Sequence, residues 1–253
     1  MRLYVDDELN AGGEISLSAA QAHYLRDVMR QREGDALALF NGRDGEWAAE
    51  IVHLAKKKAV LRVSRKLREQ TQSPDLWLIF APVKRSPIDL IAQKATELGV
   101  ARLQPALTER TVVSRVNAGR LAAIAIEAAE QSERLTAPEI RPPVKLDALI
   151  DQWPEGRRLM YCDEAGDDPS QPWGGEAGRA APALEALAPF AGEDAGPWAI
   201  LTGPEGGFSM AERAYLRALD FSVPVTLGPR ILRADTAVIA AIALWQAALG
   251  DWR

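Results

Sequence analysis

The pattern of apolar residues changes once along this chain, at the polar stretch Arg68–Pro74. Before it, short apolar runs such as Ala36–Phe40 alternate with turn residues, which is typical of β-hairpins. After it, continuous apolar runs alternate with segments of helical periodicity, which indicates a mostly parallel sheet with helices on both faces. We therefore expect a small β-barrel or half-barrel over residues 1–72 and an α/β domain over residues 73–253.

The apolar runs also give approximate bounds for the elements. In the first domain we expect a helix over Ala19–Met29, which Ser18 and Gln21 can begin with a capping box. The strands expected in that domain are Arg2–Val5, Glu14–Leu17, Ala36–Phe40, Glu46–Leu54 and Ala59–Val63. In the second domain we expect strands at Leu76–Ala81, Arg102–Leu107, Leu159–Cys162, Trp198–Thr202 and Val223–Leu227. The helices expected there are Ser86–Leu98, Arg120–Gln131, Ala177–Leu187, Met210–Leu219 and Thr236–Leu249.

The composition excludes several classes of protein. With 47% hydrophobic and 26% charged residues, the chain is globular rather than fibrous or disordered. No stretch approaches the roughly 20 apolar residues of a membrane helix, and the first residues lack an apolar signal core. A single cysteine fits a reducing compartment, so we expect a cytoplasmic protein with no membrane anchor. One Cys and two His make a zinc site improbable, and we predict no metal.

The net charge of −5 hides a basic region near the N-terminus. Residues 53–68 contain seven Lys or Arg and no acid, whereas residues 163–194 contain eight acids and one Arg. A local basic region can bind phosphates in an acidic protein, although a solvated basic strand is the competing interpretation. The overall charge therefore does not decide the partner.

Two glycine-rich loops follow apolar strands of the second domain, at residues 203–208 and 228–236. Ligands bind outside the carboxyl ends of strands in open parallel sheets. Glycines let backbone groups approach a ligand without a Cβ in the way. Neither loop matches a nucleotide-binding P-loop or the dinucleotide fingerprint. The two loops together point to a different ligand site.

The chain resembles the RsmE family in two segments, Leu201–Ser209 and Leu227–Ala237. The members of this family are SPOUT-class methyltransferases that modify N3 of a uridine in small-subunit (16S) ribosomal RNA. Further matching segments are Arg2–Asp6, His23–Arg30, Gln93–Val100, Thr108–Arg110 and Glu127–Ser132. Asp235 stands where many members carry Glu, and residues 163–194 match poorly. The resemblance implies a parallel sheet with a C-terminal trefoil knot, preceded by a PUA-like barrel that binds RNA.

The resemblance also implies the site residues. The cofactor would be S-adenosylmethionine, held by Leu201, Thr202, Gly203, Pro204, Glu205, Gly206, Leu227, Gly228, Ile231, Leu232, Arg233 and Thr236. Two residues are candidate catalytic residues. Arg233 could stabilise charge on the base, and Glu205 is the acid nearest in sequence to the cofactor pocket. The alternative role of Arg233 is an ion pair at the helix end. Candidate RNA contacts are His23, Arg26, Arg30, Lys56, Lys57, Arg62, Arg65, Lys84, Lys94 and Arg110. We assign Cys162 to the core.

The expected reaction is methyl transfer to uridine N3, which requires an unpaired or splayed-out base because N3 lies on the pairing edge. The substrate would be ribosomal RNA or the assembled small subunit. Three alternatives stay open: a SPOUT enzyme acting on another base or on ribose, a non-enzymatic RNA-binding protein, and, more remotely, a nicotinamide dehydrogenase. The last helix is apolar nearly all round, which predicts burial on most sides, within the chain or in a homodimer through the C-terminal domain.

Overall fold

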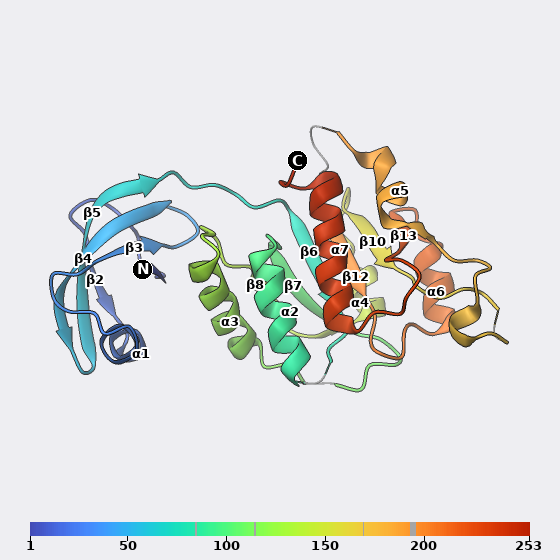
Figure 1. Cartoon of the computed structure of the whole chain (residues 1–253), viewed down its shortest axis with the longest axis horizontal. Helices are drawn as coiled ribbons and strands as arrows, with labels where there is room; N and C mark the ends of the chain where they lie inside the picture. Colours follow the sequence, from blue (N-terminus) through green and yellow to red (C-terminus); the bar gives the residue numbers. More distant parts are fainter. Residues whose placement is uncertain (84, 114, 169, 193–195) are drawn as a thin grey trace. The chain divides into compact units, whose positions relative to one another are not determined.

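The computed structural model describes residues 1–83, 85–113, 115–168, 170–192 and 196–253 (Figure 1). The chain forms two compact units. The first contains Met1–Gln72 and also Ala129–Ala137, and the second contains Ser73–Ala128 and Pro138–Arg253. A short segment from the middle of the chain thus belongs to the N-terminal unit.

The first unit is built on a five-stranded sheet in the order β1-β3-β4-β5-β2. Strand β1 pairs parallel with β3, and the other neighbours are antiparallel, as hairpins require. Leu39, Ile51 and Leu61 from the three central strands are fully buried in its core. The predicted separate N-terminal β domain is therefore confirmed. Its strands are β1 Arg2–Tyr4, β2 Glu14–Leu17, β3 Ala36–Phe40, β4 Glu46–Ala55 and β5 Lys58–Arg68.

The helix expected over residues 19–29 is only partly α-helical. Helix α1, Ala19–His23, begins with the predicted capping box between Ser18 and Gln21. The chain then continues as a π-helical turn, η1 Tyr24–Val28, which places Leu25 in the core. A capping box fixes where a helix begins but does not determine its later pitch.

Residues 129–137 are held in the first unit by Arg2. Its guanidinium donates hydrogen bonds to the carbonyl oxygens of Ala129 at 2.9 Å and Arg134 at 2.7 Å. It also pairs with Glu46, which accepts from Arg68 as well. Burial opposes ionisation of Glu46, but the hydrogen bonds from Arg68 and Arg2 keep its pKa below the usual value.

The second unit contains a parallel sheet in the order β11-β13-β10-β12-β6-β7-β8, with the short β9 beside β7. Strand β12 shows how the sheet is covered: Trp198 and Ile200 pack into one hydrophobic cluster, and Ala199 and Leu201 into another. The predicted parallel sheet with two apolar faces is confirmed. Its strands are β6 Leu76–Phe80, β7 Arg102–Leu107, β8 Glu139–Ile140, β9 Val144–Lys145, β10 Arg158–Cys162, β11 Ala181–Pro182, β12 Trp198–Thr202 and β13 Ser222–Thr226.

Helices cover both faces of this sheet. Helices α2 and α7 lie side by side over one face (Figure 1). Leu146 and Ile150 of α4 and Leu216 of α6 pack in the cluster on the other face. The helices are α2 Arg85–Glu97, α3 Ala118–Gln131, α4 Leu146–Ile150, α5 Ala183–Leu187, α6 Met210–Arg217 and α7 Ala234–Leu249, with short 3₁₀ turns η2 Pro172–Gly174 and η3 Ala188–Phe190. The knot that the family resemblance implies stays a prediction.

The helix expected over residues 177–187 is wrong in its first half. Residues Ala181–Pro182 instead form the edge strand β11, and α5 starts only at Ala183. Gly178 has a φ of 72°, and Pro182 has no N–H to donate, so a helix cannot run through both. Residues 177–187 are rich in alanine and leucine, so their composition alone predicts the longer helix.

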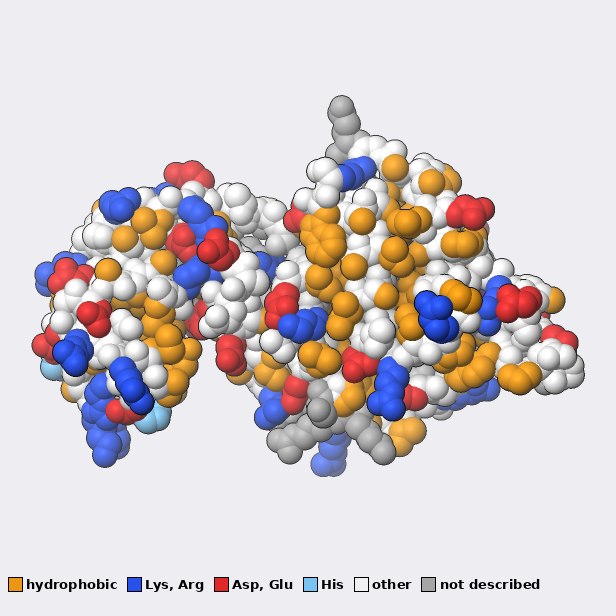
Figure 2. All heavy atoms as spheres, in the orientation of Figure 1, with side chains coloured by type: hydrophobic (Ala, Val, Ile, Leu, Met, Phe, Trp, Pro, Cys, Tyr) orange, Lys and Arg blue, Asp and Glu red, His pale blue; other side chains and the backbone are white. Residues whose placement is uncertain are grey.

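The last helix, α7, is buried on one side rather than on most sides. Val238, Ala241, Ile242, Trp245 and Leu249 lie in the core. The opposite side, with Ile239, Ala240, Ala243 and Ala247, is partly or fully exposed, and Figure 2 shows hydrophobic side chains gathered over this helix. No helix among the described residues is both long and apolar enough to cross a membrane.

Candidate functional site

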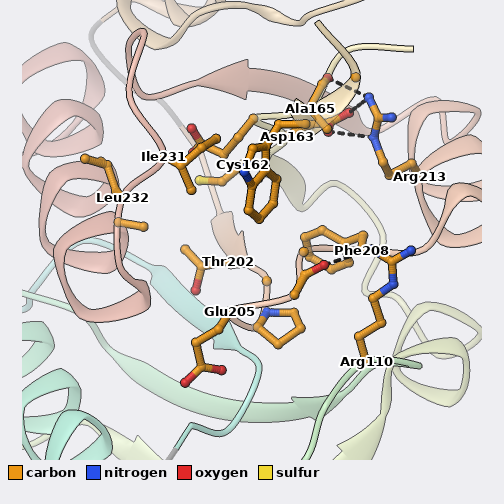
Figure 3. A pocket seen from close by; sticks show the side chains of 18 of the residues that line it. Arg110, Cys162, Asp163, Ala165, Thr202, Glu205, Phe208, Arg213, Ile231 and Leu232 are labelled. Carbon is orange, nitrogen blue, oxygen red and sulfur yellow. Dashed lines mark hydrogen bonds and ion pairs between the residues drawn. The ribbon is translucent and has the colours of Figure 1, made fainter. Parts of the chain in front are cut away.

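A cavity of about 700 Å³ lies at the carboxyl ends of β10, β12 and β13, which are neighbours in the sheet (Figure 3). Three stretches contribute most of its wall: residues 162–168, 202–208 and 231–235. Each follows one of the three strands. This is where an open parallel sheet is expected to bind a ligand.

The wall formed by residues 202–208 depends on a close approach of backbone to an aromatic ring. A Cβ at Gly203 would lie 2.7 Å from the ring of Phe208. Phe208 is itself buried and packs edge-on against Tyr161, with ring centroids 5.1 Å apart. A capping box between Ser209 and Glu212 then starts α6. Only glycine fits at position 203 without moving the ring.

Arg110 reaches the same loop from the segment that follows β7. Its Nη1 donates to the carbonyl oxygen of Gly206 at 2.8 Å (Figure 3). Nearby, the backbone N–H of Glu109 donates to Glu212 at 2.8 Å. Arg110, which we expected to contact RNA, therefore lines the cavity and supports its glycine-rich loop.

The wall formed by residues 163–168 is held by a buried ion pair. Arg213 of α6 donates through Nε to Asp163 at 2.9 Å, and both side chains are almost fully buried, with 6% and 2% exposed. Arg217 donates to the other Asp163 oxygen at 2.7 Å. Arg213 also donates to the carbonyl oxygens of Ala165 at 2.7 Å and Gly166 at 2.8 Å. One guanidinium thus fixes most of this loop.

The third wall leads from β13 into α7. Gly228 has a φ of 113°, a conformation that favours glycine. Ile231 and Leu232 offer apolar side chains to the cavity. Arg233 occupies the N-cap position of α7, and within the described part of the chain its side chain makes no ion pair with Asp235 or Glu205. The helix-end pair considered for Arg233 is therefore not formed.

The predicted cofactor residues divide into two groups. Those that line the cavity are Thr202, Gly203, Pro204, Glu205, Gly206, Ile231, Leu232 and Arg233. The others lie beside it: Leu201 is in the sheet core, Leu227 packs against the other cluster, and Gly228 and Thr236 are exposed. The lining residues that we did not predict include Cys162–Asp168, Trp173, Phe208 and Arg213.

The predicted RNA contacts lie mostly on the first unit. His23, Arg26 and Arg30 are on or just after α1 and η1, and His23 and Arg26 both pair with Asp27. Lys56 and Lys57 are exposed at the turn between β4 and β5, and Arg65 is exposed on β5. Arg62 pairs with Glu14 at 3.0 Å. The basic stretch over residues 53–68 contains no acid of its own, but the fold brings this one close to it. Lys94 of the second unit pairs with Glu97 at 2.8 Å, and Lys84 lies outside the described residues.

Two groups at or just after the end of β10 have raised pKa values. Cys162 is buried, which confirms its place in the core, and this burial raises the pKa of its thiol. Burial also raises the pKa of Glu164 to about 7, with Asp163 adding to the shift and Arg179 opposing it. A carboxyl group that titrates near neutrality in a cavity marks a candidate functional residue.

Comparison with known proteins identifies the family. Residues 70–246 match the model of an RNA methyltransferase domain, and residues 17–64 match that of an RNA methyltransferase PUA domain. The ribosomal RNA small subunit methyltransferase E of Rickettsia conorii is 31% identical over 243 residues, covering 96% of this chain and 93% of the relative.

Among the solved structures that resemble the whole chain are two with the cofactor bound. A methyltransferase from Legionella pneumophila, in complex with the cofactor SAM, is 32% identical with a TM-score of 0.81, covering 99% of this chain and 98% of that one. Ribosomal RNA small subunit methyltransferase E from Neisseria gonorrhoeae, bound to S-adenosyl methionine, is 26% identical with a TM-score of 0.80, covering 100% and 99%. With its PUA domain, its parallel sheet and both glycine-rich loops in place, the chain belongs to the ribosomal RNA small subunit methyltransferase E family.

Proposed function

We propose that this protein uses S-adenosylmethionine to methylate N3 of a uridine in small-subunit ribosomal RNA, in the cytoplasm. The observation that carries the proposal is the cavity at the carboxyl ends of β10, β12 and β13. Its glycine-rich walls are the segments in which the chain resembles its family, and two similar structures are described with this cofactor. The fold of both units agrees with the proposal.

The cavity fits a cofactor of this kind. Its volume of about 700 Å³ is in the range of small-molecule sites, about 300–1,000 Å³. Ile231 and Leu232 provide apolar surface for a flat ring, and Gly203 and Gly206 leave backbone groups accessible. When bound, S-adenosylmethionine supplies an electrophilic methyl group.

The remaining requirement is a reactive uracil N3. This nitrogen carries a proton, so a cation that stabilises the deprotonated ring favours the reaction. Arg233 lines the cavity at the start of α7 with an exposed guanidinium. It is suited to hold a phosphate or to stabilise charge on the base. Glu205, also exposed and lining the cavity, is the alternative participant.

We place RNA binding on the basic surface of the first unit, formed by Lys56, Lys57, Arg62 and Arg65. Reversing these four residues to Glu should weaken RNA binding and reduce its salt dependence, since counterion release drives phosphate binding. Titrations at several salt concentrations measure both quantities, with cofactor affinity as the control. RNA affinity unchanged by the four reversals would mean that this surface is only solvated.

We also propose a homodimer through the exposed face of α7. A helix face formed by Ile239, Ala240, Ala243 and Ala247 allows a second helix to approach closely. Ala243→Arg or Ala247→Glu should therefore yield monomers in sedimentation experiments. Ala241 is unsuitable for this test, because it is fully buried and its replacement would disrupt the core. A fully active wild-type monomer would contradict the proposal.

The decisive test compares ribosomal RNA from cells with and without this gene. Mass spectrometry should find one uridine that lacks an N3 methyl group when the gene is absent, and the purified protein should restore it. A methyl group on another base or on ribose would favour a different SPOUT activity. Failure to bind S-adenosylmethionine in calorimetry would favour a non-enzymatic RNA-binding protein.

A further inference from the structure

Glu164 places an unmatched carboxylate in the wall of the cavity. It is the second residue after β10 and lines the cavity. Both carboxylate oxygens are buried, and neither has a hydrogen-bond partner among the residues that the structure describes. Proteins rarely leave a buried charged group in this state, because it has lost its water without gaining partners.

The neighbouring charges do not compensate for this loss. Arg179 attracts Glu164 electrostatically, but its Nη1 pairs with Glu176 at 3.1 Å. Asp163, the adjacent acid, repels Glu164 and is itself paired with Arg213 and Arg217. The raised pKa of Glu164 is consistent with this environment. The carboxylate thus has two acceptor atoms that no residue in the described part of the chain uses.

The backbone at Glu164 is anchored on both sides. Before it, the carboxylate of Asp163 is bound by two guanidinium groups. After it, the carbonyl oxygens of Ala165 and Gly166 accept hydrogen bonds from Arg213. The backbone of Glu164 is therefore fixed before any ligand arrives, which lowers the entropy cost of binding.

We propose that Glu164 accepts hydrogen bonds from the two ribose hydroxyl groups of the cofactor nucleoside. This inference rests on the proposed function. Two acceptor oxygens on one carboxylate match two neighbouring hydroxyl donors, whereas an adenine ring has one amino group and a sulfonium has no donor. The ammonium of the amino-acid part is the competing donor, and the 2′-deoxyribose analogue used below keeps that ammonium, so a preference for ribose reports the hydroxyls alone. Acidic residues bind ribose hydroxyls in the same way in dinucleotide-binding folds. Glu164 then selects ribonucleosides, and its charge is satisfied only in the complex.

The test is a thermodynamic cycle between residue and ligand. The ligands are S-adenosylhomocysteine and its 2′-deoxyribose analogue, and calorimetry measures both with wild type, Glu164→Ala and Glu164→Gln. Wild type should bind the ribose form about tenfold more tightly than the deoxy form. Glu164→Ala should bind the ribose form about tenfold more weakly than wild type and bind both ligands equally. Glu164→Gln, which keeps one acceptor oxygen, should be intermediate.

Asp168→Asn is the matched control, since Asp168 lines the same cavity but already accepts hydrogen bonds from Ser170. It should keep the wild-type preference for ribose. If Glu164→Ala retains that preference, Glu164 does not bind the ribose, and the inference is overturned while the proposed function stands. If wild type binds neither ligand nor S-adenosylmethionine, the proposed function itself fails.

Melting temperatures without ligand separate binding from folding. Removing an unmatched buried charge should leave the Glu164 variants at least as stable as wild type. A lower melting temperature of Glu164→Gln together with lost binding would assign Glu164 a structural role and overturn the inference.

Discussion

Two walls of the cavity are shaped in different ways. Residues 203–208 are shaped by their own backbone, with Gly203 pressed against Phe208. Residues 163–168 are held by side chains about fifty positions later in the chain, chiefly Arg213. The first wall can be read from local sequence, because glycines and prolines restrict it directly. The second depends on a partner that only the fold brings close.

The largest expected effect is on residues 163–168, the wall that the ion pair between Asp163 and Arg213 holds. Arg213→Ala leaves Asp163 buried with Arg217 as its remaining partner among the described residues, so we expect a loss of about 3–5 kcal/mol in the free energy of unfolding. Affinity for S-adenosylhomocysteine should fall as well, because Ala165 and Gly166 lose their donor. Chemical denaturation and calorimetry measure the two effects.

Arg217→Ala is the matched control, since Arg217 is more exposed, at 27%, and donates to one Asp163 oxygen, to Asp167 and to the carbonyl oxygen of Gly178, but not to those of Ala165 and Gly166. It should lower the free energy of unfolding clearly less than Arg213→Ala does. Equal losses in the two variants would show that Arg213 is not what holds residues 163–168 in place.

The backbone-shaped wall should respond to a single methyl group. Gly203→Ala places a Cβ 2.7 Å from the Phe208 ring, so the ring or the loop must move. We expect cofactor affinity to fall about tenfold, or about 1.4 kcal/mol. Gly206→Ala is the control, because its Cβ would lie 3.6 Å from Arg110, an ordinary contact. A similar loss in both variants would mean that the close approach at Gly203 is not what shapes the loop.

The charge of Glu164 should make the stability of the protein without ligand depend on pH. Its pKa is raised from 4.5 to about 7 in the folded state, so the folded state binds the proton more tightly than the unfolded state. The resulting stability is fully present below pH 4.5 and is lost as pH rises through about 7.

Glu164→Gln lacks this titration, so its advantage in melting temperature over wild type should grow between about pH 5 and about pH 8. Glu205→Gln, measured in parallel, corrects for the loss of one carboxylate. A constant difference between wild type and Glu164→Gln would contradict the expectation.

The smallest expected effect concerns Arg110. Its side chain is exposed, so Arg110→Ala removes one hydrogen bond to Gly206 without emptying the core. We expect cofactor affinity to fall about two- to fivefold, as for a bond worth about 0.5–1 kcal/mol. Arg110→Lys should restore little, since a lysine lacks the planar group that reaches the carbonyl. An effect as large as that of Gly203→Ala would assign Arg110 a direct contact with the ligand.

The elements of this chain that its sequence predicts correctly are likewise those with local signals. Strands β2, β3, β7 and β12 and both capping boxes were predictable, because their signals lie within a few residues. The short strands β8 and β9 and helix α4 were not predicted, since two to five residues carry too little periodicity. The roles of Asp163 and Glu164 were missed for another reason. An acidic segment has the same composition whether its charges are solvated or paired with distant arginines.

Because the pair between Asp163 and Arg213 is buried, we expect cofactor binding and RNA binding to differ in their sensitivity to ionic strength. Mobile ions cannot enter the region between two side chains with 2% and 6% of their surface exposed, so salt screens this attraction little. Lys56, Lys57, Arg62 and Arg65 of the N-terminal unit are exposed to water, and added salt competes directly with any phosphate they bind. In concentrated salt the protein should therefore retain its small ligand while it releases RNA, which offers a practical route to purifying the cofactor complex free of nucleic acid.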